Sequence, residues 1–228
     1  MPANEVISPC RELRSDARRN RGRILDAARE AFGERGLDVP LEDIADRAGV
    51  GIATLYRRFP TREALVAATL EPKLAAFAEA AEQALDSPDA WAGFAGFVEW
   101  ACATQAADRG VTDLLTLMLP NSQAAEDLRA RGLRAFTGLV RRAQDQGALR
   151  GDFVPEDLAL LMIANAGVVT ATRDAAPHAW RRLVALMLES FRADHAGPLP
   201  AAPTPAQVER AMRYLSEAKG VCPSSPGP

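Results

Sequence analysis

The apolar residues of this chain recur at helical spacing over nearly its whole length, from Arg18 to Arg192. The first clear stripe consists of Ile24, Ala28 and Phe32, which share one face of a helix. Apolar and polar residues do not alternate here as they would in a strand. Leu, Ala, Arg and Glu, all good helix formers, dominate the same region. The sequence therefore predicts an all-α fold.

The charge distribution is more informative than the total charge. The 228 residues carry 27 Lys plus Arg and 30 Asp plus Glu, so the total does not indicate a nucleic-acid partner. The first 62 residues, however, hold 12 Arg against 10 acidic residues, whereas the remaining residues are net acidic. A slightly basic front end on an acidic body is typical of a chain whose front end meets an anion.

Several classes of protein are disfavoured by what the chain lacks. No apolar run approaches the roughly 18 residues of a membrane span, and the polar, Arg-rich start has no signal-peptide core. The three cysteines are far apart and without CxxC spacing, which favours a reducing cytoplasm and argues against a metal site. No nucleophile–base pair or Gly-rich phosphate loop stands out. We therefore expect no catalytic residues, no metal, no cofactor and no membrane contact.

The segment from Leu41 to Phe59, LEDIADRAGVGIATLYRRF, has the spacing of two short helices packed at a steep angle. Ala45 is small where the second helix must approach the first, and Gly49 lies at the turn, where a positive φ is wanted. Apolar residues at Ile44, Ala48, Val50, Leu55 and Phe59 would lock the pair onto the preceding helix. This spacing predicts a helix-turn-helix.

The second of these helices, Ile52 to Phe59, would expose Thr54, Tyr56, Arg57 and Arg58. Hydroxyl and guanidinium groups suit phosphate oxygens and base edges. An ordinary helical hairpin with a solvated Arg pair fits the same spacing, and the residues alone leave both interpretations open.

The stretch RILDAAREAFGERGLDVPLEDIADRAGVGIATLYRRFPTREAL closely resembles the N-terminal domain of the TetR family of transcriptional repressors, over about residues 18–66. The portion AGVGIATLYRRFPTREAL is highly specific to that family. The rest of the chain matches the family in length and helical organisation, and an SbtR-like subgroup is one candidate for it. The resemblance implies a helix-turn-helix head on a larger helical domain that binds an effector and dimerises.

The resemblance also implies DNA contacts on the second short helix. The family's recognition helix corresponds to Ile52–Phe59 and is entered through Gly51, where Ser is common. Thr54 and Tyr56 fall where the family contacts the DNA backbone and neighbouring bases. Arg57 and Arg58 fall where it places further polar or aromatic groups.

Three further positions flank these contacts. Thr61 is the expected N-cap of the next helix and joins the DNA-contact set. Arg62 replaces the Lys that commonly starts that helix and grips a phosphate. Pro40 stands where the family usually has a capping Ser or Thr, so the contact from that position is not expected here.

The domain boundaries follow from these assignments. Residues 1–17 are expected to form a flexible Arg-rich arm, residues 18–70 the DNA-binding domain, residues 71–196 the effector and dimerisation domain, and residues 197–228 a Pro-rich tail with one short helix. Near the first boundary, Arg18, Arg19 and Arg21 are further candidates for DNA contacts. They would insert into a minor groove or lie along the phosphates. Within the large domain, Pro72 is expected to open a new helix.

Aromatic and apolar residues of the large domain suggest an effector pocket, although plain core explains most such stripes equally well. The candidate pocket residues are Trp91, Phe94, Phe97, Trp100, Leu114, Met118, Phe136, Val140, Met162 and the lone amide Asn165. The effector would be largely apolar. Asn165 has an alternative role, since a buried amide can instead bond to backbone or across a dimer seam.

The last two strong helices, 155–174 and 177–192, carry more apolar surface than one small core would cover, and the family resemblance points to the same pair for dimerisation. The candidate interface consists of Leu161, Val168, Leu183, Met187 and Phe191.

The sequence thus predicts a cytoplasmic homodimer that binds an inverted repeat in double-stranded operator DNA. A small-molecule effector would release it from that operator. Two alternatives stay open: an all-α enzyme or small-molecule carrier with a structural helix-turn-helix, and a DNA-binding regulator without an effector.

Overall fold

The computed structural model describes residues 9–108, 110–111, 123–195 and 197–218, and every regular element in these ranges is helical. The all-α prediction is confirmed over this part of the chain. The α-helices are α1 (Pro9–Arg35), α2 (Leu41–Ala48), α3 (Ile52–Arg58), α4 (Arg62–Leu85), α5 (Ala90–Ala107), α7 (Gln123–Asp145), α8 (Pro155–Thr172), α9 (Ala179–Phe191) and α10 (Pro205–Ala218), with one 3-10 turn at Ala193–His195. Among the described helices, none combines the length and the apolar character needed to cross a bilayer.

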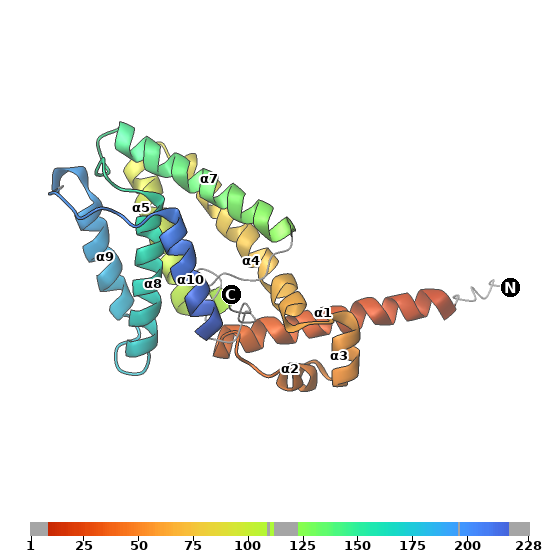
Figure 1. The fold of residues 1–228 in the computed structure, drawn as a ribbon. Coiled ribbons are helices and arrows are strands. Elements are labelled where there is room, and N and C mark those ends of the chain that lie inside the picture. The colour runs from red at the N-terminus through yellow and green to blue at the C-terminus, as the bar shows by residue number, and fades with distance from the viewer. Residues whose placement is uncertain (1–8, 109, 112–122, 196, 219–228) are drawn as a thin grey trace, which may run out of the picture.

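The helices form two parts, a head and a body, which α4 joins (Figure 1). The head consists of α1, α2, α3 and the first half of α4 around one buried cluster, called here the head cluster, which includes Ile24, Phe32, Ile44, Leu55 and Leu65. The body consists of the second half of α4 with α5, α7, α8 and α9. Its buried cluster, the body cluster, includes Phe94, Phe97, Phe136, Leu161 and Phe191.

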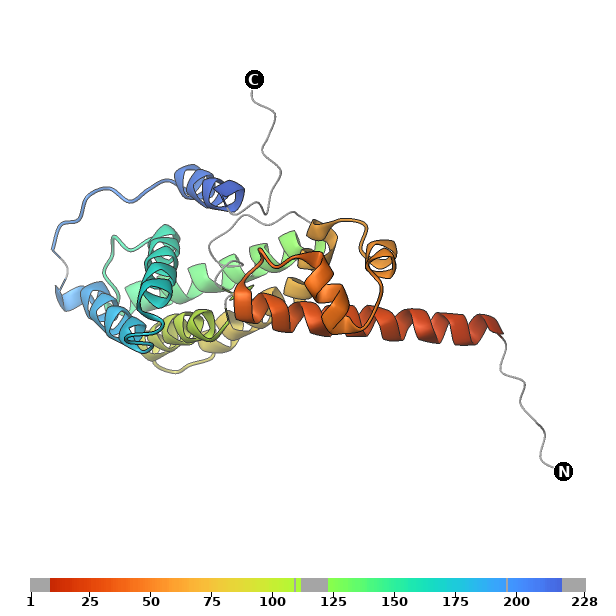
Figure 2. The same ribbon diagram turned by 90° about the horizontal axis from the view of Figure 1, so that it is seen from below.

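The first helix is longer than the sequence predicts. Figure 2 shows α1 projecting well beyond the other helices of the head. The helix begins at Pro9, so residues 9–17, predicted as part of a flexible arm, are helical in the structure. The end of this helix agrees with the prediction: Gly36 follows it at φ 80°.

The predicted helix start at Pro72 is wrong, because Pro72 lies inside α4. A proline within a helix removes one backbone hydrogen bond. Here the helix continues because Leu70 and Leu74 anchor it in the head cluster, while Ala81 anchors it in the body cluster. Beyond that point α4 and α7 run side by side through the body (Figure 1).

The C-terminal segment returns across the body. Arg150 Nη2 donates a hydrogen bond to Gly197 O at 2.6 Å, which fixes the start of the Pro-rich linker. The one short helix expected in this tail is present and begins with a reciprocal cap, since the Thr204 N–H donates to Gln207 Oε1 and the Gln207 N–H donates to Thr204 Oγ1. This helix, α10, contacts α8, and its Leu215 packs against the head cluster.

Candidate nucleic-acid interface

The turn between α2 and α3 has the geometry that the sequence predicts. Gly49 adopts a left-handed conformation at φ 62°, and Val50 N–H donates to Ala45 O at 3.0 Å. A side chain at Gly49 would be strained by that φ and would collide with Arg23 Nη2. Arg23 itself donates to Gly49 O at 3.2 Å, so α1 holds the turn directly. The sequence does not single out Arg23, which is one of the 12 arginines of the first 62 residues.

The packing of α2 and α3 is as expected. Ile44, Ala45 and Ala48 are buried on α2, and Leu55 and Phe59 are buried at α3. Pro40 precedes α2 without a side-chain hydrogen bond to it, as the sequence predicts.

Ion pairs between α1 and α2 add to this packing. Arg47 contacts Glu34 at 2.9 Å and Glu30 at 3.6 Å, and Arg35 contacts Asp43 at 2.8 Å. The hydrogen bond from Arg47 is the main cause that lowers the pKa of Glu34 below its ordinary value.

The outer face of α3 carries the strongest DNA-contact candidates. Tyr56 is 46 % exposed, and Ala53 and Arg57 are exposed on the same face. Thr54 is half-buried beside them. Gly51 precedes the helix in an extended conformation and contributes no capping side chain. Ala53 was not among the predicted contacts, because a methyl group gives no polar signal in a sequence.

Three other candidates are partly engaged within the protein. Arg58 is half-buried, and its Nε has no hydrogen-bond partner in the described part of the chain. Thr61 accepts a hydrogen bond from Ala64 N–H at 3.1 Å, which confirms it as the N-cap of α4. Arg62 Nη2 donates to Leu37 O at 2.6 Å and to Val39 O at 2.5 Å, tying the start of α4 to the segment after α1. Phosphate contacts from Thr61 and Arg62 stay predictions.

The basic residues of α1 lie on the same part of the molecule. Arg18, Arg19 and Arg21 are exposed. Arg19 pairs with Asp16, one turn earlier. Arg21 lies over the ring of Phe59 with its guanidinium carbon 5.4 Å from the centroid, so it links α1 to the residue that ends α3.

Comparisons with known proteins agree with this geometry. The family model of bacterial regulatory proteins of the tetR family matches residues 24–69, and the model of the C-terminal domain of SbtR-like transcriptional regulators matches residues 88–193. A crystal structure of a TetR transcriptional regulator from Streptomyces coelicolor is 30 % identical, with 75 % of this chain and 98 % of that chain covered at a TM-score of 0.50. The chain belongs to the TetR family of transcriptional regulators.

Two more distant structures share the TetR fold. The regulator FadR from Bacillus subtilis, solved with stearoyl-CoA, is 18 % identical over 78 % of this chain and 100 % of that chain, with a TM-score of 0.57. The regulator PfmR from Thermus thermophilus is 24 % identical over 75 % of this chain and 94 % of that chain, with a TM-score of 0.53. No curated protein sequence matches the chain.

Most of the predicted effector residues that the structure describes fill the body cluster. Phe94, Phe97 and Phe136 are buried, with ring centroids 5.5 Å apart for Phe97–Phe136 and 6.1 Å apart for Phe94–Phe136. Val140 and Met162 are buried in the same cluster. Leu114 and Met118 lie outside the described residues. Plain core packing therefore accounts for the described aromatic stripe.

The two tryptophans differ from the rest. Trp91 is half-buried beneath Arg192, whose guanidinium carbon lies 4.8 Å from the ring centroid. Trp100 is 36 % exposed and lines a surface groove of about 450 Å³ between α5 and α9, opposite Trp180.

Asn165 is fully buried and bonds within the core. Its Nδ2 donates to Gln105 Oε1 at 2.6 Å and to Cys102 O at 3.3 Å, and Gln105 Nε2 donates to Met162 O at 3.1 Å. Asn165 Oδ1 has no partner among the described residues. Burial raises the pKa of the neighbouring Cys102 thiol to about 12, so this cysteine behaves as a small apolar residue at neutral pH.

The predicted dimer seam needs correction. Leu161 is 2 % exposed and Phe191 is 7 % exposed, and both belong to the body cluster, so neither contributes to an exposed seam. Val168, Leu183 and Met187 are half-buried. Dimerisation through these two helices stays a prediction, and the residues that they expose differ from those the sequence indicated.

Proposed function

We propose that this TetR-family regulator is a homodimeric repressor that inserts α3 into the major groove of an inverted repeat and leaves it when a small molecule binds the body. The outer face of α3, where Tyr56 and Arg57 are exposed, carries the proposal. A phenol and a guanidinium on one short helix suit base edges and phosphates. Arg18, Arg19 and Arg21 would add phosphate contacts on the flank.

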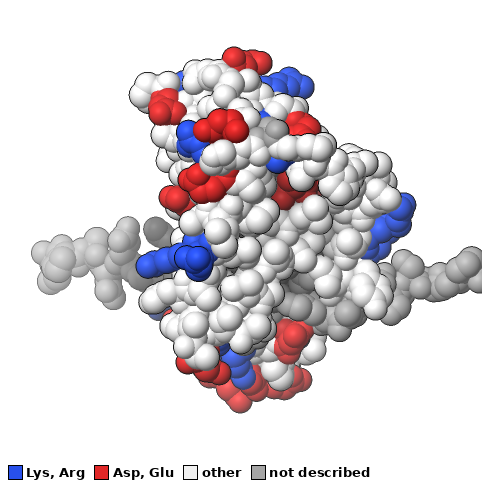
Figure 3. Space-filling model, turned by 90° about the vertical axis from the view of Figure 1, so that its left-hand side faces the viewer, with Lys and Arg blue, Asp and Glu red and all other residues white. Residues whose placement is uncertain are grey.

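A second copy of the chain supplies the second α3. One short recognition helix reads too few bases for useful selectivity, so two must be joined at a groove-matched spacing. The surface that supports dimerisation consists of Leu160, Ala164 and Gly167 on α8 and Leu186 on the neighbouring α9, all of which are exposed. Figure 3 views the molecule from the α9 side, and a broad uncharged area runs down the middle of this face.

The proposal that a small molecule binds the body rests on the buried amide side chain of Asn165. An acceptor such as Asn165 Oδ1, buried without a partner in the described part of the chain, favours a ligand that brings a hydrogen-bond donor into an otherwise apolar site. The related fold of FadR was solved with stearoyl-CoA, a ligand with a long apolar acyl chain. Binding would shift the population toward a head separation that no longer fits successive grooves, in the cytoplasm where the DNA lies.

A regulator without an effector is the second candidate, and the tight ring packing of Phe94, Phe97 and Phe136 favours it. A thermal-shift screen of apolar small molecules, followed by DNA release, separates the two. A hit that stabilises the protein and releases DNA supports the repressor with an effector.

The DNA-binding function is tested with a duplex enriched from a random-sequence pool by the wild-type protein. We expect Tyr56→Ala and Arg57→Ala each to weaken binding by about 1–3 kcal/mol in fluorescence anisotropy at fixed salt. The matched control is Arg141→Ala, which removes an exposed arginine from α7 in the body and should leave the affinity unchanged. Unchanged affinity in both α3 variants would contradict the assignment of α3 as the recognition helix.

A further inference from the structure

A part-buried ion pair joins α4 to the end of α5 at the junction of head and body. Lys73 Nζ lies 2.7 Å from Asp108 Oδ2, and the two side chains are only 18 % and 30 % exposed. Asp108 is the C-cap residue of α5, and its other oxygen accepts a hydrogen bond from Val111 N–H at 3.1 Å. The carboxylate is therefore held in place from two sides.

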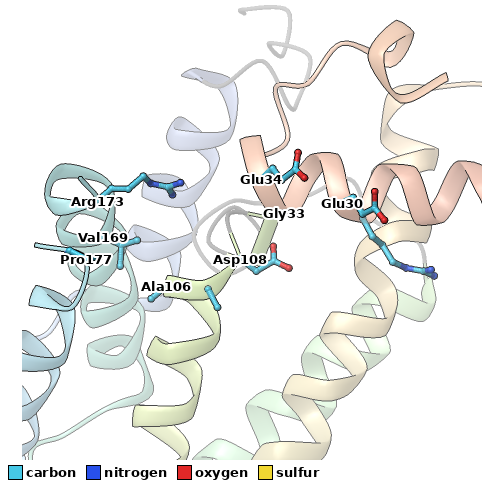
Figure 4. A pocket seen from close by; sticks show the side chains of 10 residues that line it. Glu30, Gly33, Glu34, Ala106, Asp108, Val169, Arg173 and Pro177 are labelled. Carbon is cyan, nitrogen blue, oxygen red and sulfur yellow. The ribbon is translucent and has the colours of Figure 1, made fainter. Parts of the chain in front are cut away.

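The head rests directly against this pair. A Cβ built on Gly33 of α1 would lie 3.6 Å from the Asp108 carboxylate. A Cβ on Gly110 would lie 3.1 Å from Asp108 Oδ1, 3.2 Å from Lys73 Nζ and 3.4 Å from the backbone carbon of Phe32. Gly110 thus allows a closer approach than a side chain would at the end of α5, and Gly33 brings the end of α1 to within ordinary van der Waals distance of the carboxylate, with Asp108 beside Gly33 in Figure 4.

Helix α4 lacks one backbone hydrogen bond close to this ion pair. Pro72 immediately precedes Lys73 and removes one backbone hydrogen bond from α4. The proline lies in the part of α4 that Leu70 and Leu74 anchor in the head cluster, before the helix reaches the body cluster at Ala81. Such a position is a common place for a helix to bend.

There is also room for the head to move. A groove of about 640 Å³ opens beside the pair, with Gly33 and Glu34 of α1 on one wall and Val169 and Arg173 of α8 on the other (Figure 4). Without the ion pair, a bend at Pro72 would change the width of this groove, and therefore the angle between α1 and the body.

We propose that Lys73 and Asp108 are positioning residues, which fix the angle between head and body by pinning α4 next to Pro72. This inference rests on the proposed function for its consequence: in a dimer, the head angle sets the distance between the two α3 helices and so the half-site spacing that the protein accepts. Neither residue touches DNA. They act through the placement of the whole head.

The first experiment measures the head angle without DNA. Spin labels at Asp46→Cys on α2 and Arg141→Cys on α7, in a Cys10→Ser, Cys222→Ser background diluted with unlabelled protein, report the head-to-body distance within one chain by electron–electron double resonance. We expect a narrow distribution in the otherwise wild-type chain and an about twofold wider one with Asp108→Asn or Lys73→Met. Lys73→Arg keeps the charge and should keep the narrow distribution.

The matched control breaks an ion pair that lies wholly inside the body. Arg131 on α7 holds Glu82 on α4 through two hydrogen bonds. Glu82→Gln removes one charge from α4, as Lys73→Met does, but leaves the junction intact. The distance distribution should not change. An unchanged distribution in both Asp108→Asn and Lys73→Met, each folded by circular dichroism, would overturn the proposal.

The second experiment tests the head angle through the half-site spacing that the protein accepts in DNA. The enriched duplex is compared with a version that has one base pair inserted between its half-sites. We expect the wild-type protein to lose about tenfold in affinity, and Asp108→Asn to lose less than about threefold, because a loose head tolerates the wrong spacing. If Asp108→Asn instead distinguished the two spacings as strongly as the wild-type protein does, the proposed role of the Lys73–Asp108 pair would be contradicted. If the wild-type protein enriches no duplex at all, the proposed function fails. The distance measurement still tests whether the Lys73–Asp108 pair fixes the head angle.

Discussion

Head and body differ in what determines their geometry. In the head, each short helix is fixed by contacts within a few residues or with α1: Gly49 makes the turn, Arg23 holds it, and Thr61 caps the next helix. In the body, α8 and α9 leave Leu160 at 47 % and Leu186 at 58 % exposed. One chain thus completes the head, whereas the body presents apolar surface of the kind that a partner covers. Contacts within one chain account for the head, whereas the apolar surface of α8 and α9 fits the dimer proposed above.

The largest expected effect tests the body's need for a partner. Leu160→Glu with Leu186→Glu places like charges on both sides of a two-fold seam, and burying unpaired charge costs several kcal/mol per ion. We expect a folded monomer by analytical ultracentrifugation, and an at least about hundredfold loss of affinity for the enriched duplex although α3 is intact.

Leu133→Glu is the control for this variant. Leu133 on α7 is 58 % exposed, the same as Leu186, but lies outside the proposed seam. It should leave both the dimer and the DNA affinity unchanged. A dimer that survives in the α8–α9 double variant would mean that the chain pairs through another face.

The second effect concerns the polar centre of the body. Asn165→Asp replaces a fully buried amide by a carboxylate that would face Gln105 Oε1 and Cys102 O, both acceptors. We expect the free energy of unfolding in urea at pH 7 to fall by about 3 kcal/mol or more. Thr170→Asp changes an exposed residue of the same helix and should cost far less. Equal losses would show that the core around Asn165 is open to water.

These two regions also explain what the sequence predicted. The start of α2 at Leu41, the positive φ of Gly49 and the Thr61 cap were predicted correctly, because a turn glycine and a capping hydroxyl act on the backbone beside them. The outward faces of α8 and α9 were not, since α8 is apolar on nearly every side and its sequence alone does not distinguish core from seam. Leu161 and Phe191 were therefore placed on the wrong face.

The candidate DNA contacts also include features that the local sequence predicted and features that depend on distant residues. Tyr56 and Arg57 are exposed as predicted. The engagement of Arg62 with Leu37 O and Val39 O depends on residues more than 20 positions away, which local spacing does not reveal. The continuation of α4 through Pro72 is a similar case, because Leu70 and Leu74 hold the helix in the head cluster on both sides of the proline, and Ala81 holds it further along in the body cluster.

A third, smaller effect compares one glycine from each region. Gly49 in the head and Gly147 in the body have nearly the same φ, 62° and 66°. Alanine at either position should cost about 1–2 kcal/mol of stability from the left-handed backbone. At Gly49 the added Cβ also displaces the Arg23 guanidinium, whereas at Gly147 nothing lies within 4 Å.

We therefore expect Gly49→Ala, but not Gly147→Ala, to weaken binding to the enriched duplex as well. Urea denaturation and fluorescence anisotropy on the same samples separate the two consequences. Equal DNA affinities in the two variants would show that the Arg23 contact does not hold the turn.

The smallest effect comes from the exposed charges of α1. Arg18→Gln with Arg19→Gln removes two guanidiniums from the head without touching α3, so specific and random DNA should be weakened alike. The slope of log K against log salt should become shallower by about 0.9 for each phosphate that the protein no longer neutralises. Arg134→Gln with Arg141→Gln removes the same charge from α7, and should leave that slope unchanged if the charges act by direct contact with phosphates. A slope that shifts equally in both pairs would mean that the net charge of the protein, rather than the basic face of the head, is what the DNA senses.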